Sequence, residues 1–208
     1  MKILEELILR YPQLNCCIQE ISDAINIITD CFKSDGKLLI CGNGGSCSDS
    51  EHMVGELMKG FLLKRPLTEK QLKSFKAVGV GKEFTDKLQG ALSAISLTGH
   101  PSLSTAYAND VDAEFVYAQQ TFGLGKKEDI LICISTSGNA KNVYNAAIVA
   151  NSMGIKTIAL TGISGGKLKK ICNCTICVPE SETFKVQELH LPVYHALCAS
   201  VEQHFFRE

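Results

Sequence analysis

The chain lacks a strong charge of either sign and a long hydrophobic run, and these two absences exclude two classes of protein. Its 208 residues carry 21 Lys and Arg against 22 Asp and Glu, a formal net charge of −1. A general nucleic-acid-binding protein normally has a basic surface, which this balance does not supply. No apolar run approaches the roughly 20 residues that a membrane-spanning helix needs. We therefore expect no nucleic-acid partner and no association with a membrane.

Residues 1–14 do not predict a secretory signal, and the cysteines are those expected of a cytoplasmic protein. Residues 1–14 place acidic side chains inside their apolar pattern, which is not typical of a signal peptide. Of the ten cysteines, several lie inside apolar segments, among them Cys41 and Cys133, as expected for reduced core thiols. We predict a cytoplasmic location.

A second cysteine group, Cys172, Cys174 and Cys177, lies close together in the sequence and could instead hold a metal. Its segment alternates like a strand, so we expect Cys172 and Cys174 on one face and Cys177 on the other. This spacing favours structural thiols.

Five short apolar segments alternate with helical patterns, which predicts an α/β fold with a doubly wound, five-stranded parallel sheet flanked by helices. The chain is long enough to form one domain over residues 1–208, with 45% hydrophobic residues to fill a core. In such a sheet, ligands bind at the carboxyl ends of the strands. The predicted strands are Leu38–Cys41, Ile95–Leu97, Ile130–Ile134, Thr157–Leu160 and Thr175–Val178.

Residues 1–34 predict an N-terminal helical arm. Pro12 separates a short leading helix, Ile3–Arg10, from a long amphipathic one. Apolar residues spaced by three and four form one stripe on the long helix. This stripe must be buried against the sheet or against a sister chain, so we expect oligomerisation. Its residues are Leu14, Ile18, Ile21, Ile25, Ile28 and Phe32.

Residues 61–94 read as a lysine-rich surface insertion. The pattern is weakly helical over 68–76 and 83–88, and Gly79 and Gly81 break it between the two. A solvated helical excursion and a lid over the site are both compatible with this composition.

The segment Lys37–Leu57 combines a strand, a glycine turn and a helix that could bind a metal. Gly42, Gly44 and Gly45 permit backbone angles that other residues avoid, and they let a ligand approach the main chain closely. We expect Ser46 to cap the helix that follows. His52 and Glu56 are four residues apart, so both project from one helical face as an acceptable pair of zinc ligands. The alternative is an ordinary surface pair.

A second polar loop, Ser135–Asn139, places three hydroxyls and a glycine between a buried strand and a helix. Backbone N–H groups and the helix dipole favour an anion there, so a phosphate monoester is the natural ligand. The alternative is a hydroxyl-rich cap with nothing bound. The loop lacks the lysine of a Walker A motif, and the first glycine turn is not G-x-G-x-x-G, which disfavours nucleotide binding.

The last predicted helix, from about Glu182, offers three more polar side chains. Gln187 and His195 are eight residues apart, close to two helical turns, and share one face, whereas His190 points elsewhere. Packed core residues are the alternative to ligands.

Together these motifs resemble the sedoheptulose 7-phosphate isomerase (phosphoheptose isomerase) branch of the SIS sugar-isomerase fold. The resemblance covers nearly all of the chain from Lys37 onward. It includes the glycine turn with His52-x-x-x-Glu56, the hydroxyl loop and the Gln187–His195 helix. It also includes Asn109-Asp110, which we expect to open a loop, and the segment 160–168.

The resemblance implies a single SIS domain and an intramolecular aldose–ketose isomerase acting on a phosphorylated sugar through an enediol. It implies one Zn²⁺ per subunit, bound by His52, Glu56, Gln187 and His195, with Glu56 and His195 as the acid–base pair. It also implies a homotetramer with active sites between neighbouring subunits. The positions that match substrate-binding residues of the family are Asn43, Gly44, Gly45, Glu56, Asn109, Asp110, Ser135, Thr136, Ser137 and Gln187.

Two departures from the family pattern bear on the substrate. Ala140 stands where the family usually has a further phosphate-binding serine, and the segment between Glu56 and Asn109 is longer than usual. The alternatives are therefore an isomerase of another ketose or aldose phosphate, or a non-catalytic SIS module that binds a sugar phosphate or a protein partner, like the relatives that associate with the bacterial replication initiator. Such relatives tend to lose the carboxylate or histidine of the metal site, so Glu56 and His195 favour the enzyme.

Overall fold

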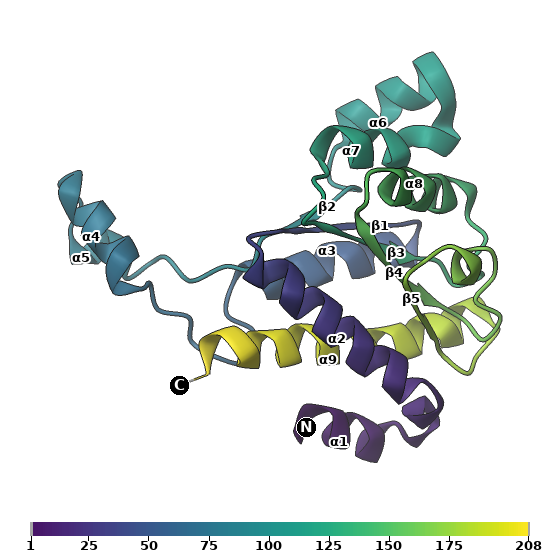
Figure 1. The fold of residues 1–208 in the computed structure, drawn as a ribbon, viewed down its shortest axis with the longest axis horizontal. Helices are drawn as coiled ribbons and strands as arrows, with labels where there is room; N and C mark the ends of the chain where they lie inside the picture. Colours follow the sequence, from purple (N-terminus) through teal and green to yellow (C-terminus); the bar gives the residue numbers. More distant parts are fainter. Residues whose placement is uncertain (1, 208) are drawn as a thin grey trace.

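The computed structural model describes residues 2–207, whose body is one five-stranded parallel sheet covered by helices on both faces (Figure 1). The strand order is β2-β1-β3-β4-β5 and every neighbouring pair is parallel. This confirms the predicted fold class. The strands are β1 (Leu38–Gly42), β2 (Ala94–Ser96), β3 (Ile130–Ile134), β4 (Lys156–Thr161) and β5 (Cys174–Cys177).

Each face of the sheet has its own core because successive side chains of a strand point in opposite directions. Leu38 and Ile40 of β1 face the layer of α2, α3 and α9, and Leu39 and Cys41 face the layer of α7 and α8. The helices are α1 (Lys2–Arg10), α2 (Ile18–Lys33), α3 (Gly45–Met58), α4 (Glu69–Ala77), α5 (Lys82–Thr85), α6 (Pro101–Tyr107), α7 (Val116–Leu124), α8 (Lys141–Ser152) and α9 (Thr183–Phe206). Among the described residues, no helix is both long and apolar enough to span a membrane.

The strand order places the topological switch point between β1 and β3. The chain leaves β1 toward β2 on one side and later continues from β3 toward β5 on the other. At such a point the loops after the two central strands diverge and open a crevice at their carboxyl ends. The glycine turn follows β1 and the hydroxyl loop follows β3, so both predicted binding loops border this crevice.

The apolar stripe of the N-terminal helices is divided between two environments. Leu14, Ile21 and Ile28 are fully buried in the core that α2 shares with α9 and β5. Ile18 and Ile25 instead line an open groove between α1, α2 and the end of α9. The break at Pro12 is a 3₁₀ helix, Pro12–Cys17, that turns α1 back against α9.

Three local predictions were wrong. Ser46 is not the cap of α3: the helix begins at Gly45, its N-cap is Gly44 with a φ of 56°, and the Ser46 side chain is buried. Only glycine adopts this backbone angle easily, so the turn closes earlier than the capping pattern suggests. Asn109 and Asp110 lie in a π-helical turn, Ala108–Asp112, that continues α6, and not in a loop.

The third wrong prediction concerns the cysteines near β5. Cys174 and Cys177 do point to different sides, since Cys174 belongs to the core under α2 and Cys177 contacts Thr161. Cys172, however, packs with the opposite core, because it lies in the turn before β5 and outside the strand alternation. Each of the ten cysteines is free.

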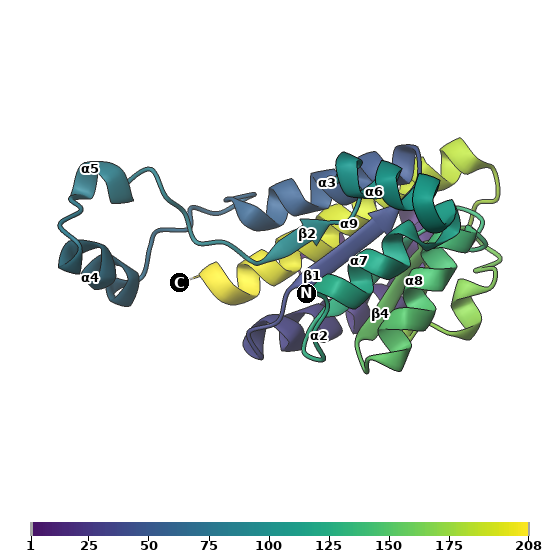
Figure 2. The ribbon, with the colours of Figure 1, turned by 90° about the horizontal axis from the view of Figure 1, so that it is seen from above.

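Residues 61–93 form an arm that carries α4 and α5 away from the sheet (Figure 2). α4 is specified locally: Thr68 and Gln71 form a capping box, in which each side chain accepts a hydrogen bond from the other residue's backbone N–H. None of its residues is buried. Phe75 and Phe84 join the two helices, with ring centroids 6.0 Å apart. The arm therefore contains two helical segments, α4 and α5.

The root of the arm, in contrast, is fixed by a buried ion pair. Arg65 Nε donates to Glu202 Oε1 of α9 at 2.8 Å, and both side chains are fully buried. Glu202 also accepts hydrogen bonds from the backbone N–H groups of Phe61, Leu62 and Leu63. Arg65 in turn donates to the last carbonyls of α3, at Glu56 and Leu57. The Arg65–Glu202 pair thus ties the arm to both α3 and α9.

Candidate active site

Asn43, in the turn after β1, is held in place by side chains from two helices. Its amide and that of Asn142 on α8 exchange hydrogen bonds, each 2.9 Å long. The Tyr117 hydroxyl of α7 donates to Gly42 O at 2.7 Å and lies 3.3 Å from Asn43 Oδ1. Neither Asn142 nor Tyr117 was predicted, because nothing in their helical sequence context distinguishes them. Both shape the glycine turn.

The glycine turn packs directly against the start of α9. A Cβ at Gly45 would lie 2.4 Å from Gln187 Nε2, so only glycine leaves room for this side chain. Gly44 is exposed with open space around its Cα. The structure therefore brings Gln187 to the glycine turn, and it leaves main-chain N–H groups accessible to a ligand.

The hydroxyl loop after β3 is braced by the glycine loop after β4. Gly162 N donates to Thr136 O at 2.9 Å, and Leu168 N donates to Gly138 O at 3.1 Å. Gly138 has a φ of 65°, and a Cβ there would lie within 2.2 Å of Gly165 O. The close approach of the two loops requires glycine on both sides.

Within the hydroxyl loop, exposure increases along the chain. Ser135 is buried, Thr136 is half-buried and Ser137 is exposed. Ser137 Oγ accepts a hydrogen bond from Asn139 N at 3.2 Å. The loop leads to the N-terminus of α8, whose N-cap is Ala140 and has no side-chain cap. An anion at this end would find free backbone donors and hydroxyls together.

His52 and Glu56 of α3 lie beside His195 of α9. His52 Nε2 is 3.1 Å from Glu56 Oε1, and the rings of His52 and His195 have centroids 5.0 Å apart. Glu56 Oε2 also accepts from Lys59 Nζ at 3.0 Å. His195 Nε2 is buried and has no hydrogen-bond partner among residues 2–207. Burial, followed by the nearby His52, lowers the pKa of His195.

The remaining predicted residues lie apart from this cluster. Asn109 and Asp110 are exposed and hydrogen-bond each other at 2.9 Å; within residues 2–207 no hydrogen bond connects them to the other site residues. Gln187 lies at the glycine turn, two helical turns before His195. His190 is fully buried, away from His195, and burial lowers its pKa to about 4.

The types of ligand atom in this cluster suit a metal ion, but their positions do not form a complete metal site. Two imidazoles, a carboxylate and an amide oxygen are donors that zinc accepts, and the buried, unpartnered His195 Nε2 is a nitrogen without a protein donor to satisfy it. Over the described part of the chain, however, no three His, Cys, Asp or Glu side chains converge as a complete metal site. His52 Nε2 and Glu56 Oε1 contact each other directly at 3.1 Å.

The parallel sheet, the crevice at its switch point and the braced hydroxyl loop define a sugar-isomerase (SIS) domain, and the family model for the SIS domain matches residues 15–95 and 84–162. A phosphoheptose isomerase of Helicobacter pylori (strain P12) is 39% identical over 185 residues, covering 89% of this chain and 84% of the relative. One from Akkermansia muciniphila is 35% identical over 187 residues, covering 90% and 86%.

Solved structures agree. A phosphoheptose isomerase from Francisella tularensis superposes with a TM-score of 0.77 at 30% identity, covering 96% of this chain and 94% of that one. The phosphoheptose isomerase GmhA from Neisseria gonorrhoeae gives 0.76 at 29% identity, with the same coverage. The chain belongs to the phosphoheptose isomerase family of SIS-domain proteins, and it is an aldose–ketose isomerase of the phosphosugar class.

Proposed function

We propose that this enzyme converts D-sedoheptulose 7-phosphate to D-glycero-D-manno-heptose 7-phosphate through an enediol. The observation that carries the proposal is the cluster of His52, Glu56 and His195, an acid–base set on two packed helices. Relatives that are 39% and 35% identical are named phosphoheptose isomerase, which supports this substrate.

The layout of α3 and α9 suits a long sugar phosphate. Gly45 and Gln187 are in contact at one end of the two helices. From there, His52 is seven residues along α3 and His195 is eight along α9, roughly 10–12 Å by the helical rise. A phosphate near the glycine turn and the hydroxyl loop would therefore leave the far end of an extended seven-carbon sugar at the His–Glu cluster.

Two residues divide the proton transfers. Glu56 takes a proton from C1 of the ketose and returns it to C2, so that the carbonyl moves from C2 to C1. His195 moves a proton from the C1 hydroxyl oxygen to the C2 oxygen in the same interconversion. The lowered pKa of His195 keeps its imidazole neutral near pH 7, as a group that accepts and donates in turn requires.

We propose further that His52, Glu56, Gln187 and His195 bind one Zn²⁺ per subunit. The support is the donor set and the unpartnered His195 Nε2. When bound, the ion polarises the substrate oxygens at C1 and C2 and lowers the free energy of the enediolate by several kcal/mol. Gln187, which lies at the glycine turn two helical turns before His195, would supply the amide oxygen of the set.

The phosphate-binding groups are those around the crevice. The hydroxyls of Ser135, Thr136 and Ser137 and the backbone N–H groups of the glycine turn supply neutral donors at a helix N-terminus. Asn43, fixed by Asn142, presents its amide beside them. Asn109 and Asp110 are exposed and are assigned to the sugar hydroxyls.

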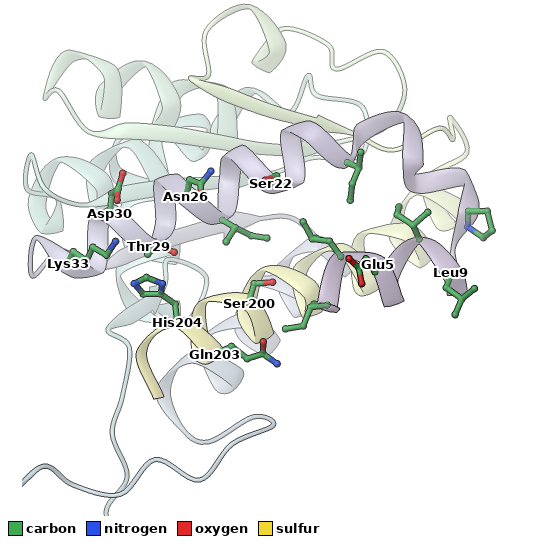
Figure 3. Close-up of a pocket in the computed structure, with 16 residues that line it drawn as sticks. Glu5, Leu9, Ser22, Asn26, Thr29, Asp30, Lys33, Ser200, Gln203 and His204 are labelled. Carbon is green, nitrogen blue, oxygen red and sulfur yellow. The ribbon is translucent and has the colours of Figure 1, made fainter. Parts of the chain in front are cut away.

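We propose that the chain acts in the cytoplasm as a homotetramer with active sites between subunits. A groove of about 940 Å³ runs between α1, α2 and the end of α9, lined by apolar side chains such as Ile8, Leu9 and Ile25 (Figure 3). A second hollow of about 370 Å³, between α1 and Phe61, includes His195 in its wall. A sister chain at these surfaces would bury the part of the apolar stripe that lines the groove and would cover the active site.

The activity is tested by proton exchange. NMR of the enzyme in deuterated water with a panel of ketose phosphates reports exchange at C1 whatever the final product. Exchange with sedoheptulose 7-phosphate is the expected result. Exchange only with a different ketose phosphate would replace the substrate, and no exchange with any member would favour a non-catalytic SIS module.

A further inference from the structure

The arm carries an apolar surface that its own chain leaves exposed. Its root is fixed by Arg65 and Glu202, and beyond the root it extends away from the sheet (Figure 2). None of the residues of α4 is buried. Four large apolar side chains of the arm are between 39% and 75% exposed: Leu72, Val78, Phe84 and Leu88. Apolar side chains that gather on one exposed element are typical of an interaction surface.

The same arm is positively charged. Residues 66–88 hold five lysines against three acidic residues. Lys70, Lys73 and Lys76 are exposed and recur every third residue, so they lie along one side of α4. Within residues 2–207, none of the five lysines forms an ion pair. A partner for this surface should therefore be apolar and negatively charged.

Residues 101–115, the acceptor segment, have this complementary character. They form α6 and the π-helical and 3₁₀ turns that follow it, and none of these three elements has a buried residue. Their exposed large apolar side chains are Leu103, Val111 and Phe115. Their charged residues are all acidic: Asp110, Asp112 and Glu114. Lys141 of α8 lies 2.9 Å from Glu114, and in the described structure no cation pairs with the other two carboxylates.

The arm and the acceptor segment do not meet within one chain. Both views show α4 and α5 well apart from α6 (Figures 1 and 2). The buried ion pair at the root holds the base of the arm in place, so the arm cannot swing back over its own body without breaking that pair. A second copy of the chain, however, presents both surfaces. The arm of each copy can then contact the acceptor segment of another.

The apolar groove between α1, α2 and α9 matches the arm less well. The charged residues that line it are of both signs, Glu5 and Asp30 together with Lys33. A basic arm gains less from a surface of mixed charge than from one that carries carboxylates alone. Charge complementarity therefore favours the acceptor segment as the contact of the arm.

We propose that the arm of one subunit docks on the acceptor segment of a sister chain, with the lysines of α4 facing its carboxylates. The contact deepens the homotetramer proposed above and rests on the self-association of the chain. It also bears on the active site, because the acceptor segment contains Asn109 and Asp110, which the proposed function assigns to the sugar hydroxyls. The arm of a neighbouring subunit then covers these two residues and excludes water from that part of the site.

The direct test is crosslinking with a carbodiimide, which joins lysine amines to carboxylates that are in contact. Crosslinks between chains appear as a covalent dimer on a denaturing gel, and mass spectrometry identifies the joined peptides. We expect the dimer to contain lysines of α4 joined to carboxylates of residues 101–115. A dimer in which these lysines are joined only to other carboxylates, such as Glu5 or Asp30 of the groove, overturns the proposal. Light scattering of the same sample separates the two proposals: a monomer overturns both, and an oligomer without the expected crosslink overturns the arm contact alone.

A second measurement follows amide hydrogen exchange in the acceptor segment. The variant carries Lys70→Glu, Lys73→Glu and Lys76→Glu, all at exposed positions of α4, so the body of the fold is unaffected. We expect faster exchange over residues 101–115 than in the wild type, because like charges prevent docking of the arm. The matched control is Lys169→Glu with Lys170→Glu, two exposed lysines of the 3₁₀ helix before β5, and it should leave exchange unchanged. Unchanged exchange over residues 101–115 in the arm variant overturns the proposal.

Discussion

The imidazole rings of His52 and His195 lie 5.0 Å apart between centroids and almost perpendicular, at 87°. One belongs to the helix that follows the first strand and the other to the helix that ends the fold. The two helices are packed along each other, and the buried Arg65 and Glu202 reinforce this packing near the base of the arm. The two halves of the candidate catalytic set are therefore held by the core itself.

The metal proposal predicts that His52→Ala and His195→Ala each lose most of the bound zinc. Elemental analysis of protein purified without chelator should give about one ion per wild-type chain, because both imidazoles supply nitrogen ligands. His204→Ala is the matched control, since His204 is exposed near the end of α9. Equal zinc content in all four proteins would contradict the site.

The phosphate proposal predicts weaker substrate binding in Ser137→Ala. The exposed hydroxyl at the start of the α8 turn supplies one neutral hydrogen bond, so the loss should be about 1 kcal/mol, measured by calorimetry with the sugar phosphate. Ser152→Ala, at the opposite end of α8, should bind normally. Identical affinity for the sugar and the sugar phosphate in the wild type would refute phosphate recognition altogether.

The assembly proposal predicts that charges in the groove produce smaller particles. Leu9 is 81% exposed and Ile25 lines the groove, so Leu9→Glu with Ile25→Glu should leave the fold intact and lower the mass in light scattering. Exchange activity should fall with it. Ile148→Glu, on the exposed face of α8, is the control. A folded double variant with full mass and activity would show that the groove has another role. Ile21 is unsuitable for this test because it is fully buried within its own chain.

The buried ion pair predicts a large loss of stability in Glu202→Gln. The substitution leaves the Arg65 guanidinium uncompensated in the core, which costs about 3 kcal/mol in the free energy of unfolding, measured with urea. Glu188→Gln, exposed on the same helix, should change it little. A loss below about 1 kcal/mol would mean that water replaces the carboxylate.

The sequence predicts the sheet well because its strands are continuous apolar runs, and all five lie within one or two residues of their expected bounds. The His52–Glu56 pair follows from helical spacing alone. Tyr117 and Asn142 do not, because each acts through contacts between elements that are far apart in the chain. Their residue types are ordinary for a helix. Where the sequence misleads, as at Ser46, a positive backbone angle at Gly44 decides the local geometry.

The arm has a closed base. Gly60 N donates to Gln89 Oε1 at 2.6 Å, and Gly90 N donates to Arg65 O at 2.7 Å, so the chain leaves the body and returns to it at neighbouring points. These hydrogen bonds at the base hold the two ends of the loop together and offset the entropy lost on closing it. Each doubling of the loop length then adds only about 0.6 kcal/mol to the free energy of loop closure. We therefore expect that residues 66–88 can be lengthened, shortened or replaced by a grafted peptide without altering the sheet.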